Sequence, residues 1–209
     1  MTLYSYVVEH DFGFAPNPFF GICTLAACKW GIRKQAHVGD YIMGTGSAKH
    51  ERSGRLVYYM VVEEAMTFDQ YWKDERFARK RPLLQGSLKF GYGDNIYHRQ
   101  PQTKRWVQED SFHSRSGGRV NLTNLRTDTK TDRVLVGTVF TYWGGTGPAV
   151  PARFRNFDGR DICVRRWYGC TFSPHMTSDA VKWLSDLGSL GCIGMPTDWA
   201  TTTPTRRNT

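Results

Sequence analysis

Apolar positions in this chain gather in short runs of strand length, separated by stretches broken by glycine and proline. Residues 3–8 alternate loosely between polar and apolar side chains, which predicts an opening strand. Residues 41–45 and 56–62 predict two more strands, and the second is an unbroken apolar run typical of a strand buried on both faces. We expect these two segments to be adjacent antiparallel strands of one curved sheet.

The first strand of this hairpin ends in the small residues Gly44, Thr45, Gly46 and Ser47. A backbone without bulky side chains can approach a ligand closely. We therefore expect residues 44–47 to line a concave site at the open end of the hairpin. The alternative is an ordinary hairpin whose glycines serve only the turn.

Capping and periodic signals predict the remaining elements. Thr67 followed three residues later by Gln70 is a capping box and begins a helix. A second helix is expected from Thr177 or Ser178 to Gly188. A short basic helix is expected over residues 29–36, strands over 134–143 and 162–172, and either state over 22–27.

This order of elements predicts an α+β fold around a small, mixed β-barrel with short interspersed helices. We expect one domain over residues 1–199, with a long insertion at about residues 83–133, and a flexible tail over 200–209. A loop as long as 83–133 is usually functional or disordered, and its aromatic residues argue against disorder.

Within this insertion, aromatic and amide side chains are unusually frequent for a solvent-exposed loop. We expect Asn95, Tyr97, Trp106 and His113 to fold back over the open end of the hairpin and close its pocket. The competing interpretation is a second core beneath the loop, with no ligand.

Charge favours an anionic partner. The 209 residues carry a net charge of +9, with a pI of about 9.5. Eight basic residues between Arg99 and Arg133 face four acidic ones. This balance, with seven tryptophans, suits nucleic acid, because bases stack on aromatic rings above a basic surface. The aromatics equally suit a well-packed β core.

Cysteine usage and hydropathy predict an intracellular protein without a metal. The five cysteines cannot all pair and are expected to be free thiols. Cys163, Cys170 and His175 do not fit a common zinc spacing, so no metal or cofactor is expected. No apolar stretch is long enough to span a membrane, and no secretory signal is visible, which predicts a cytoplasmic location.

Several blocks of this chain resemble a bacterial and phage family called nucleotide modification associated domain, type two. The blocks cover residues 11–18, 23–29, 39–40, 44–47, 93–98 and 111–114. The order of a basic helix, a Gly-Asp turn, a short strand and a long apolar strand is more distantly similar to PUA-like folds. Those folds include the ASCH, EVE and YTH domains. These resemblances imply a partly open, mixed β-barrel of the PUA/EVE/ASCH-like kind with short flanking helices. They also imply that the barrel holds a base or nucleotide and acts beside DNA-modification or phage-defence systems.

The first functional hypothesis is recognition of a modified base or nucleotide, in nucleic acid or free in solution. A base needs an aromatic face for stacking and a few polar groups at its edge, and a base in duplex DNA must be flipped out. The stacking candidates are Tyr97, Trp106 and Trp143, the edge candidates are Asn17, Thr45, Ser47, Asn95 and His113, and the phosphate candidates are Lys29 and Arg33.

The second hypothesis is a small hydrolase acting on a modified base or nucleoside. The ASCH resemblance implies catalysis by Thr, Lys and Glu, which here would be Thr24, Lys29 and Glu63 or Glu64. A buried lysine has a lowered pKa and can act as a base beside a carboxylate. Cys28 directly before Lys29 departs from the signature of that group. A sensor of a free nucleotide signal would use the same pocket. The oligomeric state has no sequence signal.

Overall fold

The computed structural model describes residues 1–48 and 51–201 and contains a six-stranded mixed sheet in the order β10-β1-β3-β4-β9-β11. β1 runs parallel to β3 and β11 runs parallel to β9, whereas the other neighbours are antiparallel. The strands are β1 (Leu3–Val8), β3 (Tyr41–Gly46), β4 (Leu56–Val61), β9 (Phe140–Tyr142), β10 (Tyr168–Gly169) and β11 (Gly191–Cys192).

The predicted hairpin is confirmed. β3 and β4 pair antiparallel with Ile42 opposite Met60, and the register shifts between Gly44 and Thr45. A Cβ atom on Gly44 would lie 2.5 Å from the ring of Tyr58 and 2.7 Å from Val8. The missing side chain at Gly44 therefore lets core residues approach the strand, in the way that glycine allows close packing.

A smaller antiparallel sheet, β2-β8-β5, continues from the large one. It consists of β2 (Cys23–Leu25), β5 (Glu64–Met66) and β8 (Val134–Gly137). The chain passes from β4 into β5 and from β8 into β9 through paired bends, where the carboxylate of Glu63 accepts hydrogen bonds from the backbone of Thr138 and Val139.

The α+β class is confirmed. Among the described residues no sheet closes on itself, and the PUA-like barrel is not confirmed.

The helices are short except for the last. They are α1 (Trp30–Gln35), α2 (Phe68–Lys73), α3 (Leu88–Gly91), α4 (Leu122–Asp128) and α5 (Pro174–Asp186). The capping box of Thr67 and Gln70 is present at the start of α2. α5 begins earlier than predicted, because Ser173 caps it and Pro174 suits the first helical position. The 3₁₀ segments are Glu75–Lys80, Ser116–Gly118, Gly144–Thr146, Ala152–Phe154 and Thr197–Thr201.

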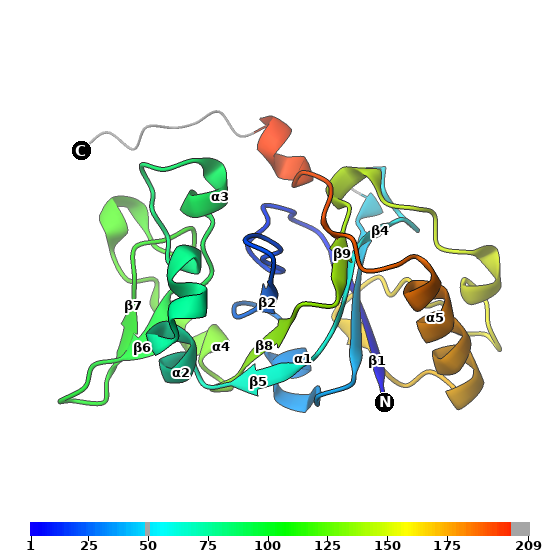
Figure 1. Ribbon diagram of the computed structural model, residues 1–209, viewed down its shortest axis with the longest axis horizontal. Helices are drawn as coiled ribbons and strands as arrows, with labels where there is room; N and C mark the ends of the chain where they lie inside the picture. Colours follow the sequence, from blue (N-terminus) through cyan, green and yellow to red (C-terminus); the bar gives the residue numbers. More distant parts are fainter. Residues whose placement is uncertain (49–50, 202–209) are drawn as a thin grey trace.

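The insertion over residues 83–133 has secondary structure of its own. It contains α3, α4 and a two-stranded ribbon of β6 (Tyr97–Arg99) and β7 (Trp106–Gln108). Figure 1 shows this part grouped with α2 on one side of the molecule, with the large sheet and α5 on the other. The predicted strand over 162–172 reduces to the two residues of β10. The predicted tail lies largely outside the described residues.

Three apolar clusters form the core. One lies between the two larger sheets and α1, and includes Tyr6, Tyr58 and Ile32. Another lies under α5. The last joins the insertion to α2, and here Tyr97 is fully buried and Trp106 packs at the edge. The rings of Tyr97 and Trp106 therefore take part in a second core, as the competing interpretation expected.

Candidate functional site

A strained turn between β2 and α1 carries a cysteine. Cys28 and Lys29 both adopt the left-handed conformation, with φ of 55° and 35°. This conformation is uncommon for residues other than glycine, and such strain is concentrated at functional sites. The backbone N–H of Cys28 donates to Oδ1 of Asp128 at 2.7 Å, which holds the turn against the end of α4.

The side chains around this turn form a chain of thiol, imidazole and carboxylate. Sγ of Cys28 lies 3.7 Å from Nε2 of His113, and Nδ1 of His113 lies 2.9 Å from Oδ2 of Asp128. An ionised carboxylate only accepts hydrogen bonds, so Nδ1 of the imidazole carries a proton toward Asp128. Nε2 then faces the thiol. This is the order of groups found in catalytic triads.

Further hydrogen bonds hold the imidazole and the carboxylate in place. The hydroxyl of Tyr97 donates to Oδ2 of Asp128 at 2.8 Å, and Gln108 donates to the Tyr97 oxygen at 3.2 Å. The amide of Asn124 donates to the backbone carbonyl of His113 at 3.0 Å. Asp128 is almost fully buried, and the side chain of His113 is 13% exposed. Well-connected buried networks of this kind fix side-chain geometry.

Arg33 supports the same turn from beneath. Its guanidinium is fully buried and donates to the backbone carbonyls of Cys28 at 2.9 Å, Asp128 at 2.6 Å and Arg133 at 2.6 Å. Burial lowers the pKa of Arg33, although Asp128 opposes the shift. The structure therefore places Arg33 as a backbone support, away from the phosphate contact that the sequence predicted.

Burial and hydrogen bonding shift the pKa of the His113 imidazole in opposite directions. Burial alone lowers the pKa of His113, but its bonds to Asp128 and Cys28 raise it to about 9. Burial lowers the pKa of Lys29, whose amine lies 4.5 Å from the centre of the Tyr6 ring. An imidazole with a raised pKa is protonated at neutral pH, so His113 places a positive charge beside Cys28 and the cavity.

A cavity of about 550 Å³ opens above the thiol and the imidazole. This volume falls within the range of small-molecule sites. The aromatic residues that line it are Trp30, Trp167 and Tyr168. Trp167 is 77% exposed and has a φ of 59°, whereas Tyr168 is held by a hydrogen bond from Gln35. An exposed aromatic ring at a cavity edge is a surface on which a base can stack.

Three exposed cations neighbour aromatic residues that line this cavity. The amine of Lys130 lies 5.0 Å from the centre of the Trp30 ring. Arg165 and Arg166 directly precede Trp167, and all three cations are exposed. Exposed arginine and lysine side chains are common protein contacts of phosphate groups.

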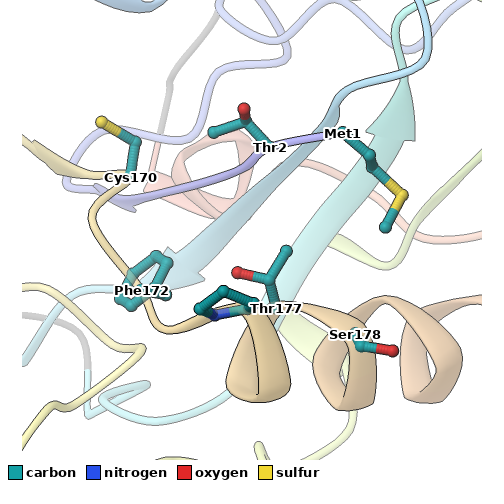
Figure 2. A pocket seen from close by; sticks show the side chains of 7 residues that line it. Met1, Thr2, Cys170, Phe172, Thr177 and Ser178 are labelled. Carbon is teal, nitrogen blue, oxygen red and sulfur yellow. The ribbon is translucent and has the colours of Figure 1, made fainter.

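A second, smaller cavity of about 250 Å³ lies elsewhere, between the start of the chain and α5. Figure 2 shows Thr177 and Ser178 on the helix and Met1 and Thr2 on the segment that leads into β1. Its lining consists of neutral polar and apolar side chains and the thiol of Cys170. We therefore place the candidate site at the larger cavity, which alone of the two adjoins the imidazole and carboxylate.

Comparison with known protein families gives a match over nearly the whole chain. The family model described as nucleotide modification associated domain 2 matches residues 1–203 of the 209. The chain belongs to this family. No curated protein and no solved structure gives a significant match. Membership in this family connects the chain with nucleotide modification, as the resemblance of its residue blocks indicated.

Two of the predicted site residues of this nucleotide modification associated domain line the cavity, namely Lys29 and His113. Tyr97 does not line the cavity, but its hydroxyl donates a hydrogen bond to Asp128, which does.

The predicted stacking tryptophans pack against other side chains. Trp106 packs edge-on against Phe68, with Arg99 over its ring. Trp143 is buried beside Tyr59, so the structure gives both tryptophans packing contacts.

The predicted polar edge residues are distributed over other parts of the molecule. Asn17 is fully buried and accepts two hydrogen bonds from the amine of Lys80. Asn95 donates to the carbonyl of Tyr71. The hydroxyl of Thr45 points to the Tyr6 carbonyl, and Ser47 is buried. None of these four residues lines either of the two cavities described above.

The three residues of the hydrolase hypothesis have separate partners. Thr24 donates to Asp94 at 2.7 Å within a buried network. Lys29 faces the cavity, and Glu63 caps the bend between strands. Glu64, the alternative acid, pairs with Arg76. The structure does not bring the predicted threonine, lysine and glutamate together.

Sequence reasoning missed the partners that the structure gives to His113. The sequence predicts Cys28 as a free thiol that interrupts a lysine signature, and Asp128 is one of four acids within residues 99–133, with no contact predicted between them. These two residues are separated by 100 positions, so their contact depends on the fold. Trp167 was also missed. The sequence contains a signal for this residue, because two arginines directly precede the aromatic side chain.

The described residues contain no helix of the length and apolar character that crossing a membrane requires.

Proposed function

We propose that this nucleotide modification associated domain binds a modified base or nucleotide in the cavity beside Cys28 and His113. The observation that carries the proposal is the exposed ring of Trp167 at the edge of the cavity, next to exposed Arg165 and Arg166. The proposal places the domain in a DNA-modification or phage-defence setting, and its family description supports the connection with nucleotide modification.

The two kinds of group correspond to the two parts of a nucleotide. A base stacking on Trp167 gains roughly 1–3 kcal/mol, which does not depend strongly on base identity. Phosphate groups meet Lys130 and the two arginines. The base edge then points inward to His113 and Asn124, which line the cavity and supply polar atoms. A substituent on the base occupies the space above Cys28.

Nucleic acid and free nucleotide both fit these contacts, and a test must separate them. A base in duplex DNA reaches the cavity only when it is flipped out, which costs a few kcal/mol. A free nucleotide or a base in a single strand has no such cost. We therefore expect single strands and free nucleotides to bind more tightly than the matched duplex.

The proposal is tested by calorimetric titration with deoxynucleoside monophosphates carrying unmodified and modified bases, and with single-stranded and duplex oligonucleotides of matched content. Trp167→Ala is expected to weaken the best ligand by about 5- to 150-fold, from the loss of one stacking contact. Trp167→Phe should recover part of this loss. Met195→Ala is the matched control, because Met195 is also highly exposed, at 64%, and lies outside the cavity lining.

The binding proposal fails if Trp167→Ala keeps wild-type affinity while melting at the wild-type temperature. It fails equally if no nucleotide or oligonucleotide in the series binds to the folded wild-type protein.

A further inference from the structure

We propose that Cys28 is the nucleophile of an acyl-transfer reaction, in which the domain hydrolyses an amide or ester substituent of the base or nucleotide held in the cavity. The identity of this substrate rests on the proposed function. The nucleophile, the imidazole and the carboxylate rest on their own geometry.

The orientation of His113 is the first support. Nδ1 bonds Asp128 at 2.9 Å, so Nε2 is the nitrogen that faces the thiol at 3.7 Å. In triads the carboxylate holds the ring in this orientation and stabilises the imidazolium that forms. The Tyr97 hydroxyl bonds the same carboxylate oxygen, which fixes Asp128 in turn.

The position of Cys28 is the second support. It lies on a turn between strand β2 and helix α1 with a left-handed backbone, and its side chain lines the cavity. A strained strand-to-helix turn is also the device that presents the nucleophile in hydrolases of other folds. A cysteine with only a packing role needs neither this backbone conformation nor an imidazole at its sulfur.

The contrast with other thiols of the chain is the third support. Burial raises the pKa of Cys23, Cys163 and Cys192, which makes each of them less reactive. Cys28 is half-buried, faces the cavity and has an imidazole at its sulfur. Asp128, Tyr97 and Lys29 are the other titratable groups beside this pair.

The reaction balances without a cofactor. The sulfur of Cys28 attacks the acyl carbon of the substituent, while the proton of this thiol–imidazole pair is held on Nε2 of His113. The carbon–nitrogen or carbon–oxygen bond to the base or nucleotide then breaks, and His113 gives the proton to the departing amine or alcohol. Water attacks the resulting thioester, and His113 moves a proton from this water to the thiol. The products are a carboxylic acid and the deacylated base or nucleotide.

Iodoacetamide provides a test that needs no substrate. Peptide mass spectrometry measures the alkylation rate of each cysteine in the native protein at pH 7. Cys28 is expected to react at least ~10-fold faster than Cys192, because an imidazole lies at its sulfur, whereas burial raises the pKa of the Cys192 thiol. Cys192 is the matched control, since it is the more exposed thiol. His113→Asn should slow Cys28 by ~10-fold and leave Cys192 unchanged, because asparagine cannot hold the positive charge.

Turnover is tested with deoxycytidine and deoxyadenosine acetylated on the exocyclic amine. Wild-type protein should release acetate, and rapid acid quenching should trap acetyl on Cys28. Cys28→Ala and His113→Asn should bind these nucleosides but release acetate at least ~100-fold more slowly. Trp167→Phe should change the KM more than the kcat, since it alters binding.

The outcomes separate this inference from the binding proposal. Slow alkylation of Cys28 in a protein that still binds nucleotide overturns the nucleophile and leaves the binding site standing. Fast, His113-dependent alkylation in a protein that binds no nucleotide supports the nucleophile and overturns the assigned substrate. Fast alkylation with nucleotide binding but no acetate release limits Cys28 to a reactive thiol and overturns acyl hydrolysis.

Discussion

Nε2 of His113 lies 3.7 Å from Sγ of Cys28, although 85 residues separate the two in the chain. Cys28 comes from the turn after β2, and His113 comes from the insertion between β7 and α4. The contact therefore forms only when the insertion packs on the smaller sheet. The packing of the insertion in this second core therefore positions the His113 imidazole beside the Cys28 thiol.

His113 should make the stability of the protein depend on pH. Its pKa is about 9 in the folded protein against an ordinary value of 6.5. A group whose pKa is raised by folding stabilises fully below pH 6.5, and this contribution is lost as the pH rises toward 9. The loss amounts to roughly 3 kcal/mol at most. Urea unfolding between pH 6 and 9.5 should show this decline in wild type and a flatter profile in His113→Asn. Parallel profiles would contradict the assignment.

Arg33 should contribute more to stability than any exposed ion pair. Arg33→Met leaves the carbonyls of Cys28 and Asp128 buried without their donor, and we expect a loss on the order of 3 kcal/mol or more. Arg76→Met is the matched control. Arg76 bonds the carboxylates of both Glu64 and Asp74 but is half exposed, so its loss should be below about 1 kcal/mol. Chemical denaturation measures both, and equal losses would show that Arg33 does not hold the turn.

The buried hydroxyl of Tyr71 should contribute to stability although Tyr71 does not line the cavity. It donates to Oδ1 of Asp94 at 2.7 Å, and both groups are fully buried. Tyr71→Phe leaves a buried carboxyl with one donor fewer, and should cost about 1.5–3 kcal/mol. Tyr41→Phe removes an exposed hydroxyl near Ser185 and should change stability by less than about 0.5 kcal/mol. Thermal melting compares the two variants, and a smaller effect of Tyr71→Phe would contradict the account.

Binding of a single-stranded oligonucleotide should weaken with salt, because bound phosphates release their counterions. The eight basic residues of the insertion do not contribute equally. Arg99 pairs with Asp132, and Arg133 donates to backbone carbonyls. Lys130 lies beside Trp30 of the cavity lining, and Arg165 and Arg166, outside the insertion, directly precede Trp167.

Replacing Lys130, Arg165 and Arg166 together by glutamine should reduce the slope of log affinity against log salt by about 2. Lys182→Gln is the control, because Lys182 is exposed on α5 and pairs with Asp186. Fluorescence anisotropy at a series of salt concentrations measures the slope. An unchanged slope in the triple variant would place the phosphates elsewhere.

Local signals were sufficient to predict part of the fold. The hairpin of β3 and β4 follows from an apolar run flanked by turns, and the capping box of Thr67 and Gln70 is a contact between neighbours in sequence. The strand predicted over 162–172 was mostly wrong because apolar residues there, such as Ile162, face the core from irregular backbone. Periodicity cannot distinguish these cases.

The candidate site was harder to predict than the fold. Gly44 lies in a run of small residues that is typical of a backbone close to a ligand, yet the ring of Tyr58 occupies the space beside it. Arg33 is a residue type that often contacts phosphate, yet it is fully buried. Only His113 and Lys29 were identified among the residues that line the cavity. The others come from three distant segments, which the sequence alone does not bring together.

Protection of Cys28 from alkylation tests the central claim most directly, because it asks whether the nucleotide occupies the cavity above the reactive thiol. Iodoacetamide is added at pH 7 with and without a saturating concentration of the tightest nucleotide found by calorimetry, and the rates at Cys28 and Cys192 are measured in the same sample. We predict that bound nucleotide slows Cys28 by ~10-fold or more and leaves Cys192 unchanged. An unchanged rate at Cys28 with the nucleotide bound would contradict the account, because the ligand would then lie outside this cavity.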